Sequence, residues 1–182
     1  MAAANDFFDQ RELITDPAPE RYTICYDHSC SSIVTDSLDT TEWRRATAPF
    51  SSAVTTATAE RAAIADSIAI LETIVGNHIG TSNDKGGNLS GIGKPGQFDC
   101  IDESTNTTSY LRMLENHALL RFHTVMKAST RFGLFVGMPH STAVIREIAS
   151  GEQFAVDSWF FDNGQAPYIV KLTDWKDGKD PY

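Results

Sequence analysis

The sequence predicts an α+β domain in which helices pack against an antiparallel sheet. Apolar residues recur at helical spacing between about residues 58 and 116, and from residue 121 onward the spacing changes to two. Helices followed by strands are typical of α+β domains, whereas α/β domains alternate the two. A chain of 182 residues is long enough to bury its own core, so we predict an N-terminal arm over residues 1–20 and one domain over residues 21–182.

The first elements are short. Residues 1–20 are polar and end in Asp16-Pro-Ala-Pro19, which favours an arm ahead of the domain. The β-branched and aromatic runs 22–26 and 32–35 flank a turn and predict a hairpin. Trp43 and Phe50 flank a short helical stretch.

Two longer helices are expected next. The first runs from about Thr58 to His78 and ends at glycines 76 and 80. Its apolar stripe is Ile64, Ile68, Leu71 and Val75, and the acidic residues off that stripe are Glu60, Asp66 and Glu72. The second helix runs from Asp99 or Cys100 to Asn116, with an inward face of Tyr110, Leu111, Leu114 and Ala118.

A glycine-rich loop joins these helices, and four strands follow them. The loop, Gly80–Gly96, lacks the Gly-Lys-Ser/Thr of a phosphate-binding loop, so we interpret it as a surface loop that is a candidate for lining a site. The strand-like runs are 121–129, 140–148, 153–160 and 168–172, with a turn at Ser150-Gly151 between the middle two.

The charge of the chain restricts its partners. The 15 Lys and Arg residues against 24 Asp and Glu give a net charge of −9, which disfavours nucleic acid and anionic membrane surfaces. No apolar run approaches the roughly eighteen residues of a membrane span. The first residues show neither a basic nor an extended apolar segment, so we expect no signal peptide in the chain as written.

The three cysteines fall into two groups. Cys25 and Cys30 lie five positions apart, and Cys100 is isolated. We favour a Cys25–Cys30 disulfide, which implies an oxidising compartment and hence a periplasmic or secreted protein. Two reduced thiols remain open, as does a metal site that includes His28, although a structural zinc needs a fourth ligand nearby.

Cys100, His140 and Asp157 are the candidates for chemistry. Cys100 opens a predicted helix, whose N-terminus favours a thiolate and offers N–H groups to an oxyanion. The alternative is a buried structural cysteine. Asp99 and Asp102 oppose ionisation of the thiol unless their carboxylates cap the helix or bind backbone donors.

His140 and Asp157 lie on neighbouring predicted strands. A carboxylate inside the apolar strand around Asp157 needs a partner, and His140 is suitable because the carboxylate then fixes its tautomer and raises its basicity. Trp159 shares a face with Asp157 and is expected to shield this bond. The turn at residues 150–151 does not pair the two residues directly, so we expect a bulge, a wider loop or sheet twist to bring them together. The reserve candidates for the third role are Asp162 and Asn163.

These motifs resemble the bacterial transglutaminase-like cysteine peptidases of the papain-like superfamily. The run Asp99-Cys-Ile-Asp102 matches the family's Asp-Cys-x-Asp element, and His140 with Ala143-Val144, displaced by two residues, approximates its His-Ala-Val strand. Asp157-Ser-Trp159 resembles both the family's Asp motif and the Asn-Ser-Trp of papain. The resemblance covers roughly residues 60–172. Two features differ: Glu103-Ser104 replaces the usual Tyr or Ala, and papain's oxyanion glutamine lies farther upstream than Gln97 does.

The resemblance implies a papain/transglutaminase-like fold and a thiol-dependent hydrolase that cleaves amide bonds of peptides or proteins without a cofactor or metal. Cys100 is then the nucleophile, His140 the base, Asp157 its orienting group, and the Cys100 N–H with Gln97 the oxyanion site. The alternatives are a non-catalytic binding or assembly module of the same fold and a protein transamidase. A metal hydrolase ranks below these because no paired-histidine spacing is present.

Overall fold

The computed structural model of the protein describes residues 13–51, 54–87, 94–134 and 138–182, and it confirms the α+β class. The elements in chain order are β1 (Tyr22–Tyr26), β2 (Ser32–Asp36), α2 (Thr40–Thr47), the 3-10 helix η1 (Ala48–Phe50), α3 (Ala57–Ile79), α4 (Cys100–Asn116), β3 (His123–Leu134), β4 (Met138–Glu147), β5 (Gln153–Asp157), β6 (Tyr168–Lys171) and α5 (Leu172–Lys176). The predicted helices and strands are therefore confirmed, with boundaries that differ by a few residues.

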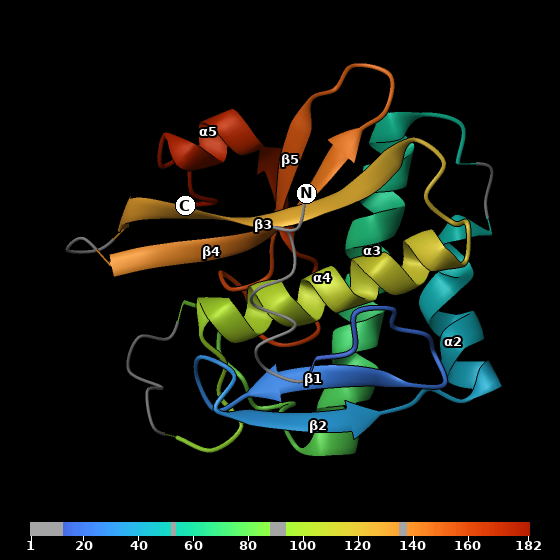
Figure 1. Cartoon of the computed structure of the whole chain (residues 1–182), viewed down its shortest axis with the longest axis vertical. Helices are drawn as coiled ribbons and strands as arrows, with labels where there is room; N and C mark the ends of the chain where they lie inside the picture. Colours follow the sequence, from blue (N-terminus) through green and yellow to red (C-terminus); the bar gives the residue numbers. More distant parts are fainter. Residues whose placement is uncertain (1–12, 52–53, 88–93, 135–137) are drawn as a thin grey trace.

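The strands form two antiparallel sheets. β1 and β2 form the predicted hairpin, and the larger sheet has the order β3-β4-β5-β6. Figure 1 shows α4 crossing the centre of the molecule, with the four-stranded sheet on one side and the β1–β2 hairpin on the other. α3 packs beside α4, and the short α5 lies against the sheet near the C-terminus.

Because α4 has neighbours around its circumference, even its polar residues are buried. The six consecutive residues Ser104–Ser109 are each at most 6% exposed. Their small side chains allow close packing, and they bond locally: the Thr108 hydroxyl donates to the Ser104 carbonyl, and the Asn106 amide pairs with the backbone of Cys25. The predicted inward residue Ala118 is exposed, because α4 ends at Asn116 and Ala118 adopts a left-handed conformation.

α3 is capped as its sequence predicts. The Thr56 hydroxyl accepts the Ala59 N–H (3.1 Å), and Gly80 closes the helix with a left-handed φ of 80°. By length and composition alone α3 is apolar enough to cross a membrane, but half of that stretch is buried within the protein, as in a core helix. The absence of a membrane span therefore stays a prediction.

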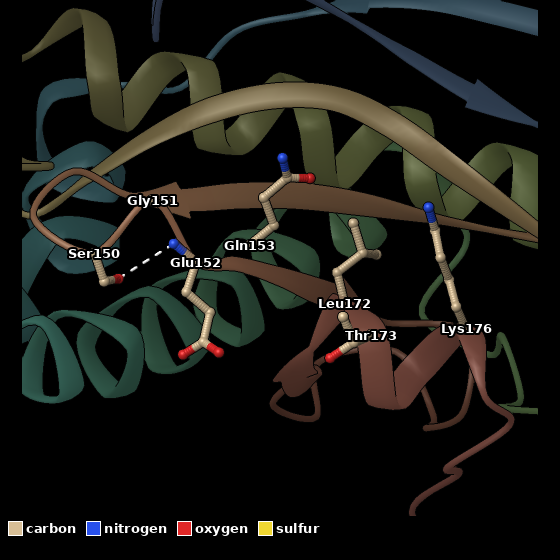
Figure 2. Close-up of a pocket in the computed structure, with 7 residues that line it drawn as sticks. All are labelled: Ser150, Gly151, Glu152, Gln153, Leu172, Thr173 and Lys176. Atoms are coloured by element: carbon tan, nitrogen blue, oxygen red, sulfur yellow. Dashed lines mark hydrogen bonds between the residues drawn. The ribbon is translucent and has the colours of Figure 1, made fainter.

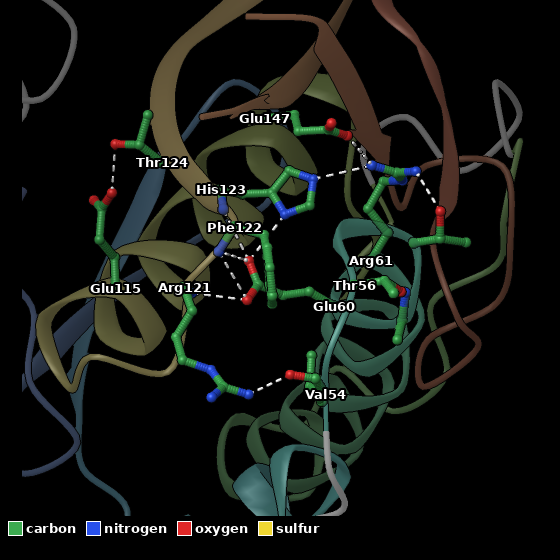
Figure 3. Close-up of polar contacts among 12 residues, drawn as sticks. Val54, Thr56, Glu60, Arg61, Glu115, Arg121, Phe122, His123, Thr124 and Glu147 are labelled. Atoms are coloured by element: carbon green, nitrogen blue, oxygen red, sulfur yellow. Dashed lines mark hydrogen bonds and ion pairs between the residues drawn. The ribbon is translucent and has the colours of Figure 1, made fainter. Parts of the chain in front are cut away.

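The expectation that the acidic residues of α3 lie away from the core is wrong for two of them. Glu60 is fully buried and Glu72 is 6% exposed, whereas Asp66 is exposed. Figure 3 shows the reason for Glu60: its carboxylate accepts the backbone N–H groups of residues 121–123 and the Nδ1–H of His123, at 2.7–3.1 Å. The neighbouring Arg61 donates to Glu147 and to Nε2 of His123. Glu60 therefore fixes the start of β3 against α3.

The N-terminal hairpin contains the predicted Cys25–Cys30 disulfide, which is compatible with an oxidising compartment. The four residues 27–30 all have positive φ, between 54° and 66°, although none is glycine. Over the described ranges, no group of three or more His, Cys, Asp or Glu side chains is arranged to hold a metal. The described part of the predicted arm contacts the domain: Leu13 packs against the disulfide, and the Ile14 N–H donates to Thr23.

Candidate active site

Cys100 is the first residue of α4, and Asp99 caps the helix. The Asp99 carboxylate accepts the N–H groups of Ile101 and Asp102, and the Asp102 carboxylate accepts the Asp99 N–H in return. This reciprocal capping box fixes the first turn of the helix. It thereby fixes the position from which the Cys100 side chain projects.

The carboxylates of Asp99 and Asp102 also bind the turn that the disulfide closes. Asp102 accepts the backbone N–H groups of His28 (2.8 Å) and Cys30 (2.6 Å), and Asp99 accepts the N–H (2.9 Å) and hydroxyl (3.0 Å) of Ser29. Both acidic neighbours of the cysteine thus bind backbone donors, which is the arrangement that a reactive Cys100 requires. Burial, followed by the charge of Asp99, still raises the pKa of Asp102 to about 6.

The Cys100 sulfur is partly exposed and lies against the strand that contains His140. Its thiol donates to the Pro139 carbonyl (3.9 Å), and the backbone N–H of Ser141 points to the sulfur. Burial, together with the charges of Asp99 and Asp157, raises the pKa of Cys100 to about 11, although the Ser141 N–H opposes the shift. The helix N-terminus therefore does not produce a resting thiolate, and the group is a thiol at neutral pH.

His140 and Asp157 form the predicted pair. Nε2 of His140 donates to Oδ2 of Asp157 at 2.7 Å, and both side chains are at most 3% exposed. An ionised carboxylate only accepts hydrogen bonds, so Nε2 carries the proton, and no hydrogen bond of Nδ1 is found among the described residues. Asp157 therefore holds the His140 ring in the orientation that a candidate base requires.

Of the three explanations that the sequence left open, a bulge, a wider loop or sheet twist, the bulge is absent between β4 and β5. These strands pair in continuous register from Ala143↔Val156 to Arg146↔Gln153, and the next step places Thr142 beside Asp157. His140 lies two residues before Thr142, on the same face of the sheet. A diagonal contact between long side chains on one face spans this offset.

Aromatic rings surround the imidazole of His140. The ring centroids of Trp159, Phe160 and Trp175 lie 4.9, 5.4 and 5.6 Å from it. Trp159 occupies the predicted shielding position, and its backbone N–H donates to Oδ1 of Asp157 (3.3 Å). Because these rings exclude water, the His140–Asp157 bond is stronger than an exposed one.

Cys100 and His140, the candidate nucleophile and base, are not joined by a direct side-chain hydrogen bond among the described residues. The sulfur instead contacts the backbone of the two residues that flank His140. Such bonds are often long in free enzymes and tighten when substrate binds.

Gln97 is buried, but its amide is bound within the glycine-rich loop. Its Nε2 donates to the carbonyls of Asn83 and Gly96, and its Oε1 accepts the Lys85 N–H. The reserve candidates also lie at this loop: Asp162 binds Lys85 and the Gly86 N–H, and the backbone N–H of Asn163 donates to Asp84. The structure therefore brings Cys100, His140, Asp157 and Trp159 together, whereas the contacts described for Gln97, Asp162 and Asn163 are with the loop.

The loop itself lies beside the site. In addition to the Asp162 contacts, the Gly87 N–H donates to the Trp159 carbonyl (2.7 Å), so the described end of the loop follows the segment after Asp157. Gly86 is required there, because a Cβ at this position would lie 2.4 Å from the Phe161 backbone. Residues 88–93, at the centre of the loop, lie outside the described residues.

Three buried carboxyl groups interact near the start of α4: Glu103 of the helix itself, Glu72 of α3 and Asp84 of the glycine-rich loop. Burial raises the pKa of Glu72 to about 8 and that of Asp84 to about 6, and it raises the pKa of Glu103 well above its usual range. Each group is further disfavoured as an anion by its acidic neighbours. The raised pKa values favour the protonated, neutral forms of these three carboxyl groups, which makes this part of the protein less negative than its acidic residues alone would suggest.

A separate pocket opens away from these residues. Figure 2 shows it between the β4–β5 turn and α5, lined by Ser150–Gln153, Leu172, Thr173 and Lys176. None of the candidate catalytic residues lines it.

Sequence reasoning missed one member of the site, Trp175. This residue is fully buried, and its indole N–H donates to Oδ2 of Asp157 at 2.7 Å. A tryptophan in a polar segment directly after the last strand is a weak sequence signal for a buried position.

No protein-family model, curated protein or solved structure matches the chain.

Proposed function

We propose that this protein is a thiol-dependent amide-bond hydrolase, a peptidase or amidase, with a Cys100–His140–Asp157 triad. The observation that carries the proposal is the buried His140–Asp157 pair. The Cys100 sulfur lies against β4, the strand that contains His140, and Nδ1 of His140 has no hydrogen bond among the described residues. A papain-like arrangement of the fold, with the nucleophile opening a central helix and the other two residues on adjacent strands, is part of the same proposal.

In the proposed reaction, Sγ of Cys100 attacks the acyl carbon of the amide as Nδ1 of His140 accepts the thiol proton. The tetrahedral intermediate collapses when His140 returns this proton to the leaving amine, which departs and leaves a thioester on Cys100. Water then attacks the thioester with His140 as the base, and the carboxylic acid and the thiol are released.

The raised pKa of Cys100 determines how the first step proceeds. Because burial raises it to about 11, the thiol remains protonated until attack, and the base must remove its proton in the transition state. Asp157 supports this transfer, since its carboxylate stabilises the imidazolium that forms.

The backbone N–H of Cys100 is the first oxyanion donor in this proposal, because it points toward its own sulfur at the helix N-terminus. Gln97 contributes as the second donor only if its amide leaves the carbonyls of the loop. Hydrolysis is preferred over transamidation because water needs no dedicated acceptor site. The disulfide supports a periplasmic or secreted location for the enzyme.

A turnover experiment tests the proposal. Wild type, Cys100→Ala and the control His117→Ala, which changes an exposed histidine at the end of α4, are incubated with labelled casein and with pooled peptide amides. We expect amine release by wild type and the control, an acyl adduct on the α4 peptide by mass spectrometry, and no release by Cys100→Ala. Equal turnover by Cys100→Ala contradicts the proposal, and adding hydroxylamine separates hydrolysis from transamidation by forming hydroxamates.

A non-catalytic binding or assembly module is the second candidate. The protonated thiol of Cys100 and the unformed bond to His140 favour it. Iodoacetamide labelling near pH 6 discriminates between the two: a thiol with a functional base reacts there, and an inert thiol does not. The disulfide protects the other two cysteines, so the label reports Cys100 alone.

A further inference from the structure

We propose that Trp175 is a positioning residue of the triad. Its indole N–H keeps the Asp157 carboxylate in the orientation that binds His140, and it makes that carboxylate a weaker acceptor for the imidazole N–H. This inference rests on the proposed function, because it assigns a role to Trp175 only if His140 acts as a base toward Cys100.

The geometry at Asp157 supports this role. Oδ2 of Asp157 accepts two hydrogen bonds of equal length, from Nε2 of His140 and from Nε1 of Trp175, each 2.7 Å. Oδ1 accepts the longer bond from the Trp159 N–H (3.3 Å). Trp175 is therefore the only described side chain, apart from the base itself, that donates to the carboxylate.

Trp175 is itself held firmly. Its side chain is fully buried, and the guanidinium of Arg131 lies 4.5 Å above its ring and donates to its backbone carbonyl. Arg131 pairs with His140 across β3 and β4, and it also binds Asp180. Arg131 thus connects α5 to the strand pair β3–β4, which contains His140, so the indole N–H of Trp175 has a fixed direction.

The second donor has a chemical consequence. Two donors share the charge on Oδ2, so the oxygen attracts the proton of an imidazolium less strongly than an oxygen bound by His140 alone. Removing the indole N–H leaves the full charge facing the ring. His140 then retains a second proton to higher pH, and the pH above which it can accept the thiol proton rises.

Other charged and titratable groups face the pair, and every test variant retains them. They are Cys100 and Glu103 of α4, Arg131 of β3, and Asp180 and Tyr182 of the C-terminal segment. The indole N–H is thus the one interaction of the carboxylate that the test removes.

The test compares the pH dependence of Cys100 alkylation by iodoacetamide in wild type, Trp175→Phe and the control Trp43→Phe, which removes a distant indole on α2. We expect the acidic midpoint of Trp175→Phe to move up by about one pH unit, with about fivefold slower alkylation at the wild-type midpoint. The midpoint of Trp43→Phe is expected to match wild type. Circular dichroism establishes that each variant is folded.

A second measurement needs no change at Trp175. The chain has three tryptophans, so ¹⁵N-labelled indoles give three N–H signals, and Trp43→Phe and Trp159→Phe identify two of them by loss. We expect the remaining signal to titrate with the same midpoint as Cys100 alkylation in wild type. This keeps the inference testable even if Trp175→Phe does not fold.

The outcomes separate the two proposals. If wild-type Cys100 shows no acidic midpoint that depends on His140, the proposed function fails and the role of Trp175 fails with it. If wild type shows that midpoint but a folded Trp175→Phe keeps it, or the Trp175 signal does not titrate, only the inference about Trp175 is overturned.

Discussion

The carboxyl group of Glu72 lies inside the molecule with an incomplete set of hydrogen bonds. Its Oε2 accepts the Gly164 N–H (3.2 Å), and its Oε1 has no partner among the described residues. Burial raises its pKa from 4.5 to about 8. In the unfolded chain the group ionises near its ordinary value, so the folded state binds one more proton between these two values.

Glu72 therefore makes the protein less stable as pH rises. We expect the free energy of unfolding of wild type to fall between about pH 4.5 and pH 8, and Glu72→Gln to flatten this fall and to be about 2 kcal/mol more stable than wild type at pH 9. Urea unfolding at pH 5, 7 and 9 measures the effect. An unchanged pH dependence in the variant would show that Glu72 is ionised in the folded protein.

At the scale of residues, sequence analysis selected Cys100, His140 and Asp157 as the candidate nucleophile, base and orienting carboxylate, chiefly because Cys100 and Asp157 interrupt their surroundings. Cys100 opens a helix after a loop, and Asp157 is a charge within an apolar strand. The structure brings the three residues near one another, and their roles stay predictions. Sequence analysis did not identify Trp175, since that residue reaches Asp157 only through the packing of α5 on the sheet. The effect of Asp99 on the Cys100 thiol was anticipated from the sequence, whereas the contributions of burial and of Asp157 to the raised pKa of Cys100 depend on tertiary packing.

At the scale of elements, the start of β3 depends on α3 through one carboxylate. Glu60 accepts three consecutive backbone N–H groups of residues 121–123, which would otherwise lack partners inside the protein (Figure 3). Buried N–H groups without partners cost about 1–3 kcal/mol each.

We expect Glu60→Ala to lower the free energy of unfolding by roughly 3 kcal/mol or more. Asp66→Ala is the matched control, because Asp66 is an exposed acidic residue on the same helix, and it should change stability by less than about 0.5 kcal/mol. Urea denaturation of both variants decides the matter. Equal stabilities of the two variants would refute the structural role of Glu60.

The turn at residues 27–30 is held by hydrogen bonds to the start of α4 and by the disulfide. Three of its four left-handed residues, His28, Ser29 and Cys30, donate backbone N–H groups to Asp99 and Asp102, and the Cys25–Cys30 disulfide closes the turn. Left-handed conformations are unfavourable for residues other than glycine, so the closed disulfide and these bonds together hold the turn.

Loss of the disulfide should therefore destabilise the protein. For so short a loop we expect Cys25→Ser/Cys30→Ser to cost about 2 kcal/mol, or about 4–8 °C in Tm. The control is Cys100→Ser, whose Tm should fall by the same amount on treatment with a phosphine reductant as that of wild type. A Tm of wild type that does not respond to reduction would contradict the stabilising role of the bridge.

For the whole molecule, the order of helices and strands was sufficient to predict the class and most of the elements. The position of α4 was not predictable, because a helix with a run of six small polar residues has the composition of a solvent-exposed one. Its burial between the hairpin and the four-stranded sheet brings Cys100 to β4, at the junction of both sheets (Figure 1). The site is thus a product of the topology.

The proposed function requires that His140 accepts the proton of the Cys100 thiol. Only Cys100 is free to react in the oxidised protein, so the rate of its alkylation by iodoacetamide between pH 5 and pH 11 reports this proton directly. We predict two rising steps for wild type, a lower one that depends on His140 and one near the thiol pKa of about 11, and only the second step for His140→Ala. Identical single-step profiles for both proteins would contradict the claim.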